Sequence, residues 1–532
     1  MMPASPTTLT LGQRLSYGVG HVLNDLAASM WFSYLLVYLQ FVLQVPTSYA
    51  GIVLLIGQIV DAVATPLVGH LSDSACHSKC CSLSWSYGKR KTWHLIGTVL
   101  VCFSFPFIFA GLERNASLTT LLAFLVPLVI VFQIGWAATQ ISHLALIPEL
   151  TPVEAERDEL NIIRFAFDLV SDMLVYIVAW LVLSRHKIEG TSVLPAPVNL
   201  PITSVFNSTS ESLHLIDPSD ASSFMTIVSI VTTIGIFFTI IFHFGTPEAI
   251  SNSLEGLRFE KSFRQNMEWK DWFSECHFYL IGLIYMTSRI FHNLSNVYMP
   301  LYLQEGLGAQ QELLAVIPLV MQVAGFLGSL LLKIGNSAIG KRSGYLFGGF
   351  IGGCACVWLY FASNTMLLDK LQIYGVAALM GFSGSVVVVL ATSFTADLIA
   401  VNTESGAFVY GCMSFCDKLS CGIAVAVIQS LHSSFCNPSC QWYYRNILAI
   451  GILLPLVVGC AAVVPLYSIK LGARNGEKRA FLNRGESASS IESNKSENKS
   501  GNRVPAKDPS RLLYPDYGTA GSSKGFTSEF IM

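Results

Sequence analysis

Ionisable side chains recur at helical spacing inside long apolar runs of this sequence. His21 and Asp25 lie one helical turn apart in the first run, and Asp61 and Thr65 have the same spacing in the second. A charge at the centre of a membrane-spanning helix costs on the order of 2.5–3.5 kcal/mol on insertion scales. Each of these side chains therefore needs a partner or a ligand, and the chemistry available to them together is the binding of a polar solute.

Three later runs carry stripes of the same kind. In chain order they are Arg164, Asp168 and Asp172, then Arg289, His292, Asn293 and Asn296, and last the adjacent pair Asp417 and Lys418, with His143 near the end of a separate run. Asp25 follows the start of its run by about nine residues, and Asp61 precedes the end of its run by about nine. At roughly 1.5 Å per residue, both lie near the midplane of a core about 30 Å thick.

Charges of both signs at similar depth in five helices predict a shared polar cavity. The candidate solute-binding residues are Asp25, His143, Arg164, Asp168 and Arg289. The alternative is a set of structural ion pairs between packed helices, of which Arg164 with Asp168 is the obvious one. For a single residue the two interpretations are comparable, whereas the concentration of charge favours the cavity.

The composition indicates that the solvent of this chain is the lipid bilayer. Of 532 residues, 52% are hydrophobic and only 12% are charged, and the mean hydropathy is +0.54. A soluble domain carries about 25% charged residues, whereas a spanning helix needs about 20 mostly apolar ones. The sequence therefore predicts an integral membrane protein.

The apolar windows predict the architecture. We expect spanning helices near 15–43, 48–70, 92–111, 120–147, 162–184, 222–244, 275–302, 312–333, 343–363, 372–396, 405–431 and 445–468. A short segment at 1–14 precedes two six-helix halves at 15–244 and 273–468, which a polar segment at 245–272 separates. The predicted fold class is an all-α integral membrane protein with 12 transmembrane helices.

Basic residues in short loops predict the orientation, because Lys and Arg are enriched in cytosolic loops. Gly88–Lys91 is the densest basic loop of the first half, and Lys333, Lys341 and Arg342 occupy the corresponding place in the second. Both loops, both termini and the central segment should therefore face the cytosol.

Two sequons and one cysteine pair fall on the opposite side in this topology. The sequons begin at Asn115 and Asn207, and we expect glycans there. Cys436 and Cys440 share a short loop on the same side, where the compartment permits a disulfide. Free thiols are the alternative, because a gap of three residues does not guarantee the geometry.

The tail at 469–532 differs in composition from the rest of the chain. Ser, Asn, Lys, Glu and Gly dominate residues 486–503, so this stretch is expected to be disordered. Asp508, Leu512 and Leu513 have the acidic-dileucine spacing that adaptor proteins read as an endosomal or lysosomal sorting signal. Clathrin adaptors are therefore expected partners of the tail.

Other functions are not predicted. The net charge of −2 argues against nucleic-acid binding. Gly335–Arg342 nearly spells a phosphate-binding loop, but Arg342 stands where such a loop needs Ser or Thr. Cys76, Cys80 and Cys81 could bind a metal, but apart from His77 no fourth ligand has a convincing spacing, so no metal site is expected. No nucleophile and base have a convincing spacing, so neither an enzyme nor a cofactor is predicted.

The loop after the second run resembles a feature of the major facilitator superfamily. The second run ends through Gly69 and Asp73, and the third begins at Gly88, Lys89 and Arg90. In that superfamily the corresponding loop couples a membrane carboxylate to a cytosolic gate, so the resemblance implies a gate formed by these residues. It also implies the major facilitator fold, in which two pseudo-symmetric halves alternate access to a central site.

Further residues resemble one branch of that superfamily, the glycoside–pentoside–hexuronide cation symporters. Asp25 and Arg164 look like the sugar-binding residues of the branch. Asp61 resembles the first of two carboxylates on its second helix, and Lys418 resembles a lysine near its cation site. Thr65 replaces the second carboxylate, so the resemblance does not imply a sodium site in this chain. We expect proton coupling through Asp61 or Asp25 instead. The coupling candidates are Asp61, Thr65, Asp417 and Lys418.

Longer stretches look like a narrower group of these proteins. They are Arg14–Tyr17, Leu23–Asp25, Thr139–His143, Ile147–Leu150 and Ser405–Gly411. That group is associated with lysosomes and melanosomes, with entry of cysteine into them, and with control of pigmentation. The resemblance therefore implies a transporter of cysteine from the cytosol into the organelle lumen.

The charges are compatible with a zwitterionic substrate. A carboxylate needs a cation such as Arg164 or Arg289, and an ammonium group needs an anion such as Asp25. Two alternatives stay open: a cation symporter of the same fold for a sugar or sugar conjugate, and a non-transporting membrane scaffold whose charges are fixed in structural pairs.

Overall fold

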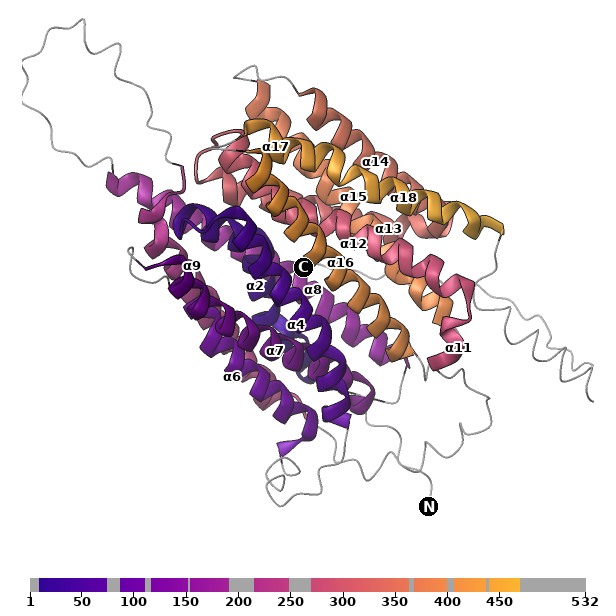
Figure 1. Cartoon of the computed structure of the whole chain (residues 1–532). Helices are drawn as coiled ribbons and strands as arrows, with labels where there is room; N and C mark the ends of the chain where they lie inside the picture. The colour runs from indigo at the N-terminus through magenta and orange to yellow at the C-terminus, as the bar shows by residue number, and fades with distance from the viewer. Residues whose placement is uncertain are drawn as a thin grey trace, which may run out of the picture. The chain divides into compact units, whose positions relative to one another are not determined.

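Helices make up all of the regular structure that the computed structural model describes (Figure 1). The described residues are 9–73, 87–110, 116–151, 154–190, 215–247, 269–362, 368–399, 406–436 and 440–468. They contain twelve long helical segments, of which eleven are long and apolar enough to cross a membrane. The expectation of an all-α integral membrane protein is therefore confirmed.

The first six long segments are here called the N-terminal set. Its first segment is divided into α1 (Leu11–Gly18), η1 (Val19–His21), α2 (Val22–Ser29), η2 (Met30–Tyr34), α3 (Leu35–Val37) and η3 (Tyr38–Val42). The others are α4 (Thr47–Asp73), α6 (Lys89–Ile108), α7 (Leu118–Leu150), α8 (Glu154–Gly190) and, after the short η6 (Pro218–Asp220), α9 (Ala221–Gly245).

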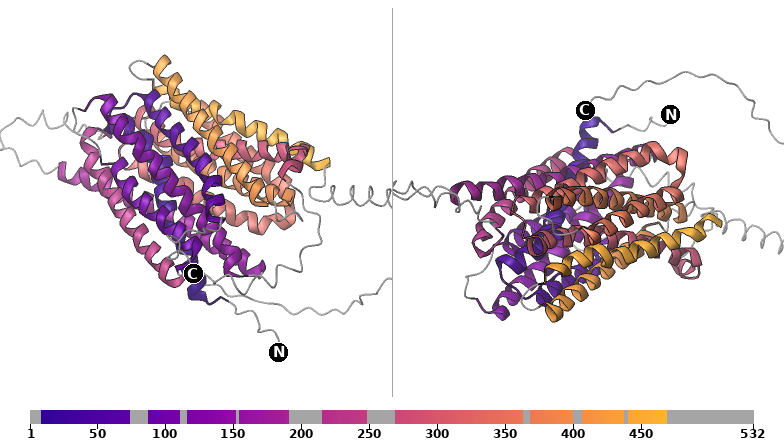
Figure 2. Two further views of the ribbon diagram at one scale, coloured as in Figure 1. Left: turned by 60° about the horizontal axis from the view of Figure 1, so that its bottom comes forward. Right: turned by 90° about the horizontal axis from the view of Figure 1, so that it is seen from above.

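The last six long segments are here called the C-terminal set. After the short α11 (Trp269–Phe273) they are α12 (Cys276–Leu301) with η9 (Tyr302–Gly306), α13 (Leu313–Ile339), α14 (Lys341–Phe361), α15 (Leu368–Ile399), α16 (Gly406–Phe435), and a segment made of α17 (Gln441–Asn446), η11 (Ile447–Gly451), α18 (Leu453–Val463) and η12 (Val464–Ser468). In every view the helices of each set lie together (Figure 2).

The helix α12 is the one long segment of the twelve described that is not among the eleven apolar enough to cross a membrane. It has 26 residues, enough to cross a membrane. Its polar stripe, which includes Arg289, Asn293 and Asn296, lowers its hydropathy. Because it contacts α15, α16, α18 and the first segment of the N-terminal set, this helix lies inside the bundle, where a polar face does not meet lipid.

The helix α8 begins at Glu154, whereas the apolar pattern predicted a start near residue 162. Its first turns are polar and are stabilised by α1. Arg14 Nη2 lies 3.0 Å from Glu156 Oε1, and Arg14 also pairs with Glu159. Hydropathy marks only the part of a helix that lies in hydrocarbon, so it could not reveal this extension.

The first segment of the N-terminal set departs from regular α-helix. The part at η1 has the 3-10 form, and η2 and η3 are π-helical. A Cβ atom on Gly20 would lie 2.5 Å from the ring of Phe242 and 2.8 Å from the ring of His143. Only glycine therefore lets the backbone of η1 approach α7 and α9 so closely.

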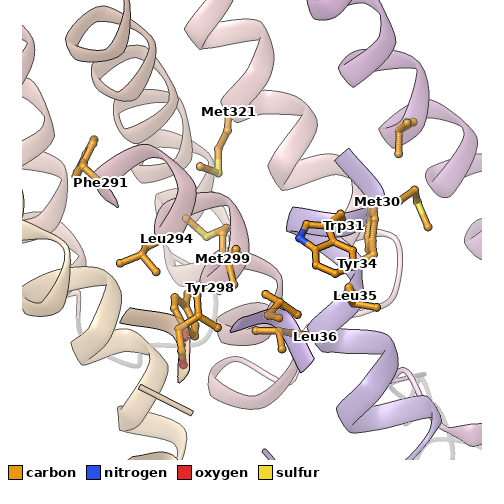
Figure 3. Packing of buried hydrophobic residues seen from close by; sticks show 14 of the residues in the cluster. Met30, Trp31, Tyr34, Leu35, Leu36, Phe291, Leu294, Tyr298, Met299 and Met321 are labelled. Carbon is orange, nitrogen blue, oxygen red and sulfur yellow. Dashed lines mark hydrogen bonds between the residues drawn. The ribbon is translucent and has the colours of Figure 1, made fainter. Parts of the chain in front are cut away.

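Apolar packing joins the two sets through the first segment and α12. Met30, Tyr34, Leu35 and Leu36 belong to one buried cluster with Leu294, Tyr298 and Met299 of α12 and Met321 of α13 (Figure 3). Trp31 of the same segment stacks on Phe132 of α7. All of these side chains are buried. The contacts lie in the second half of the first segment, which is remote from the basic loop at Gly88.

Hydrogen bonds close the same end of the molecule, here called the far end. Tyr34 Oη donates to the carbonyl of Leu314 at 3.2 Å. Gln40 Nε2 donates to Gln429 Oε1 at 3.2 Å, and Tyr444 Oη donates to Gln40 Oε1 at 3.2 Å. These bonds connect the N-terminal and C-terminal sets, so the far end is sealed by both apolar and polar contacts.

The packing of Gly20 yields a stability prediction. We expect Gly20→Ala to lower the melting temperature of the purified protein in detergent, because overpacking a buried site costs about 1–3 kcal/mol. The matched control is Gly12→Ala in α1, where a Cβ would meet nothing within 4 Å. Equal melting temperatures for both variants would contradict the close approach of η1 to α7 and α9.

Candidate functional site

Two of the predicted binding residues, Arg164 and Asp25, meet at His21. Arg164 of α8 donates from Nη2 to His21 Nε2 at 3.3 Å, and His21 Nδ1 lies 2.5 Å from Asp25 Oδ1. An arginine only donates. Nε2 of His21 is therefore the acceptor, and Nδ1–H of the same neutral ring donates to Asp25. The imidazole thus bridges a guanidinium and a carboxylate. Arg164, His21 and Asp25, which bring a cation and an anion together, are here called the array.

The carboxylates of α8 continue this array. Asp168 lies against Asp25, at the range where the two side chains and Arg164 interact. Asp172 accepts from Ser29 and, at 2.9 Å, from Gln322 Nε2 of α13. Asp172 therefore links the two sets, whereas Asp25 and Asp168 face one another within the N-terminal set.

Two polar atoms of the array have no hydrogen-bond partner. They are Arg164 Nε and Asp25 Oδ2, and both atoms are buried. Among the described residues Arg164 forms no ion pair within 4.0 Å, so the pair with Asp168 that the alternative interpretation proposed is not formed there. A buried polar group without a partner costs about 1–3 kcal/mol. The array thus keeps one buried donor and one buried acceptor whose hydrogen-bonding capacity is not used.

A second polar cluster lies in the C-terminal set. Arg289 Nε is 3.9 Å from Asp417 Oδ2, close enough for ion pairing but too long for a hydrogen bond. Asn293 Nδ2 and Cys421 Sγ donate to Asp417 Oδ1 at 3.3 and 3.4 Å. The Arg289 side chain is 32% exposed, although its Nε faces Asp417 of α16.

The two sets are joined at mid-helix by a buried ion pair. Lys418 Nζ lies 2.7 Å from Asp61 Oδ2 and donates to Thr65 Oγ1 at 3.1 Å. Thr65 in turn donates to Asp61 Oδ1 at 3.1 Å. The side chains of Asp61 and Lys418 are only 6% and 12% exposed. The structure therefore brings three of the four coupling candidates together, with Asp417 facing Arg289 instead.

His143 lies beside the array and is fully buried. Its ring stacks on Tyr17 with centroids 4.3 Å apart, and its Nε2 donates to the Tyr17 carbonyl at 2.8 Å. Tyr17 Oη donates back to the carbonyl of His143 at 3.1 Å. His143 thus holds α7 against the first segment, and its contact with a substrate stays a prediction.

The predicted gate residues cluster within the N-terminal set. Arg90 Nε donates to Glu149 Oε1 at 3.0 Å, and Arg90 Nη1 donates to Ser72 at 2.5 Å. Ser72 donates to the carbonyl of Gly69 at 3.0 Å. These bonds tie α4, α6 and α7 together. Lys89 is half-buried at the start of α6, and the side chain of Asp73 lies outside the described residues.

The C-terminal set repeats this arrangement. Gly88 precedes α6 with φ at 109°, and Gly340 precedes α14 with φ at 79°. Both values lie in the region that favours glycine. Lys341 then pairs with Asp397 of α15 at 2.7 Å, as Arg90 pairs with Glu149 of α7. The two sets are therefore related in structure at their basic loops.

The remaining predicted positions are the cysteine pair, the sequons and the sorting signal. The structure joins Cys436 and Cys440 in a disulfide, with Cα atoms 5.3 Å apart. The sequons and the sorting signal, at Asn115, Asn207, Asp508, Leu512 and Leu513, lie outside the described residues. In the described ranges no three His, Cys, Asp or Glu side chains converge to hold a metal ion.

Two buried or half-buried histidines near the array were missed from the sequence. His94 of α6 is 1% exposed. Its Nδ1 lies 3.1 Å from Nε2 of the half-buried His243 of α9. A histidine within an apolar run is a feature that the sequence does show. The two runs are far apart in the chain, however, so the sequence does not show that these histidines meet. Their proximity depends on the packing of α6 against α9.

Comparison with known proteins agrees with this architecture. Residues 16–436 match the family described as MFS/sugar transport protein. The human major facilitator superfamily domain-containing protein 12 is 40% identical over 481 residues, which are 88% of this chain and 95% of that protein.

Solved structures share the fold at low sequence identity. A D-xylose–proton symporter superposes with a TM-score of 0.59 at 12% identity, covering 87% of this chain and 98% of its own. The nucleoside transporter NupG superposes with a TM-score of 0.56 at 11% identity, covering 86% and 100%. The major facilitator fold is thereby confirmed. This chain belongs to the MFS/sugar transport protein family of the major facilitator superfamily.

Proposed function

We propose that this transporter carries a zwitterionic amino acid, cysteine, from the cytosol to the opposite side of its membrane. The observation that carries the proposal is the array with two unpartnered atoms, Arg164 Nε and Asp25 Oδ2. Their charges are opposite, and they match the carboxylate and ammonium groups of an amino acid. Arg289 supplies a second cation for the carboxylate from the C-terminal set, since its Nε lies 3.9 Å from Asp417 and has no hydrogen-bond partner.

The sealed far end supports a direction for loading. Tyr34 and Gln40 connect the two sets there, so we propose that substrate enters from the basic end, near Gly88, and that this end faces the cytosol. Rocking of the sets would then open the far end and release the substrate. The gate at Arg90 would hold the N-terminal set rigid during this movement.

The mid-helix ion pair supports a role in coupling. Asp61 and Lys418 belong to different sets, so a rocking movement changes their separation. We propose protons as the coupling ion, because protonation of a carboxylate removes its charge and weakens such a pair. Thr65 offers a hydroxyl but no charge, which does not favour sodium.

The location is also a proposal. The resemblance to lysosomal and melanosomal proteins and the acidic-dileucine pattern at Asp508, Leu512 and Leu513 support the membranes of those organelles. Cysteine import into the lumen would then influence pigment synthesis. Clathrin adaptors are the proposed readers of the tail, and glycans are proposed at Asn115 and Asn207.

A sugar is the second candidate substrate, which the family description and the fold of the D-xylose–proton symporter favour. Its hydroxyl groups would donate to Asp25, but a neutral sugar would leave the charge of Arg164 without an anion. In proteoliposomes we expect unlabelled L-cysteine to compete with labelled L-cysteine uptake, and D-xylose and D-glucose not to compete. Competition by the sugars at equal concentration would favour the second candidate.

Neutralising the array should abolish transport. We expect Asp25→Asn and Arg164→Gln each to reduce labelled L-cysteine uptake at least tenfold, which is about 1.4 kcal/mol or more of lost interaction. The control is Arg157→Gln on the same helix, where Arg157 donates to the carbonyl of Thr151 outside the array. Uptake at the wild-type rate in both array variants would remove this site assignment.

The mid-helix pair yields a prediction about stability. Asp61→Asn leaves Lys418 buried without a counter-charge, and breaking a buried pair from one side costs about 3–5 kcal/mol. We expect a large fall in melting temperature for this variant and a smaller fall for Asp61→Asn combined with Lys418→Met. Additive effects of the two substitutions would show that the pair does not stabilise the contact between the sets.

A further inference from the structure

Four histidines of the N-terminal set form a row that the proposed function does not explain. They are His243 of α9, His94 of α6, His143 of α7 and His21 of η1. Successive ring centroids are 5.0, 6.0 and 5.7 Å apart. The outer end, at His243, is half-buried beside the exposed Tyr87, and the inner end contacts Asp25.

Hydrogen bonds fix the proton positions in the outer half of the row. The carbonyl of Gly20 can only accept, so His94 Nε2 carries the hydrogen of their 2.9 Å bond. In a neutral ring His94 Nδ1 is then an acceptor, and it receives the Nε2–H of His243 at 3.1 Å. His243 Nδ1 accepts in turn from Tyr87 Oη at 2.7 Å. Every donor in this half therefore points inward.

The inner half of the row contains an acceptor without a partner. His143 Nε2 donates to the Tyr17 carbonyl, which leaves Nδ1 as the acceptor of a neutral ring. That Nδ1 is buried and has no hydrogen-bond partner. It lies on the one ring that connects His94 to His21. At His21 the Nε2 position is occupied by Arg164, and the Nδ1–H donates to Asp25.

A structural role explains the carbonyl bonds but not the whole row. The bonds from His94 and His143 to Gly20 and Tyr17 hold the irregular backbone of the first segment. They do not require the bond between His94 and His243, nor an unpartnered nitrogen on His143. Metal binding does not explain the row either, because in the part of the chain that is described no three such ligands converge.

We propose that the four histidines form a proton relay between the surface at Tyr87 and Asp25. Histidine suits this role because its neutral ring accepts a proton at one nitrogen and releases one from the other. The relay runs between α6, α7, α9 and the first segment, inside the N-terminal set. It therefore does not cross the contact between the two sets and stays intact when they move.

The transfer balances with one proton. Tyr87 Oη gives its proton to His243 Nδ1 and regains one from water. His243 gives its Nε2 proton to His94 Nδ1, and His94 gives its Nε2 proton to His143 Nδ1. His143 then gives its Nε2 proton to His21 Nε2, and the His21 Nδ1 proton moves to Asp25 Oδ1. Each ring ends neutral in its other tautomer, and Asp25 ends neutral. The two inner transfers need ring rotations away from the Gly20 and Tyr17 carbonyls.

The groups around the row disfavour a positive charge that stays on any one of the four imidazole rings. The groups that face the row are Tyr87 and Lys91 at its outer end, Tyr17 beside His143, and Arg164, Asp168 and Asp25 at its inner end. Lys91 and Arg164 lie at opposite ends, and both repel a positive charge that rests on a ring. A proton therefore passes inward to a carboxylate.

Arg164 modulates the relay, a step that rests on the proposed function. In the present structure its Nη2 donates to His21 Nε2 and competes with proton transfer to that nitrogen. A substrate carboxylate that draws Arg164 away would free the nitrogen. Binding of the substrate would then accelerate protonation of Asp25, which couples the two events.

The test follows protonation of Asp25 in the full-length protein without substrate. After an acid jump, time-resolved infrared difference spectra would record the carboxylic-acid band that Asp25→Asn removes. We expect His94→Gln and His243→Gln to slow the rise of this band at least tenfold with its final amplitude kept. The kept amplitude shows a folded site, and glutamine retains a donor for the Gly20 carbonyl.

The matched control is His432→Gln, at a buried histidine of the C-terminal set that pairs with Glu305 at 2.9 Å. In this variant the carboxylic-acid band of Asp25 should rise at the wild-type rate. Wild-type rates in both relay variants would overturn the proposal. A separate assay tests the proposed function: L-cysteine exchange across the membrane of vesicles that have the same pH inside and outside. If the wild-type protein shows no exchange, cysteine is not its substrate, whereas the infrared result on the relay is unaffected.

Discussion

The cost of placing charge in hydrocarbon is the constraint on which the rest of this structure depends. An isolated charge at the centre of a bilayer is unfavourable, so each one here is compensated by a group from another helix or by solvent-accessible space. Asp61 meets Lys418, and Asp172 accepts from both Ser29 and Gln322. These bonds hold together helices that apolar contact alone would not orient, because lipid is as apolar as the helix surfaces.

The compensation is incomplete where function is proposed. Arg164 and Asp25 share the imidazole of His21 but keep one unpartnered atom each. At the far end, by contrast, the polar groups of Gln40 and Gln429 bond one another between apolar walls. A carrier needs this difference, because a substrate can replace missing partners only where they are missing. The array thus combines a structural bridge with an incomplete site.

Much of the fold followed from composition, and less of the site did. Most helix ends were predicted to within a few residues. The exceptions are α8, which ion pairs with Arg14 extend back to Glu154 and which continues to Gly190, and α13, which continues to Ile339. The polar stripes identified Asp25 and Arg164 as neighbours in function. They did not identify His21 as the group between them, and His94 was overlooked. A lone histidine in an apolar run carries no sign of the partner that it meets.

The amino-acid sequence was sufficient to predict a bundle of spanning helices and the approximate place of each helix in the chain. The reason is local: a segment crosses a bilayer if it has enough consecutive apolar residues, and its backbone bonds are then satisfied within the helix. The packing of the helices was needed to learn which charges meet, as Lys418 and Asp61 do, and which atoms have no hydrogen-bond partner, as with His143 Nδ1. These outcomes depend on the packing of helices that are distant in sequence, and periodicity along one helix contains no information about its neighbours.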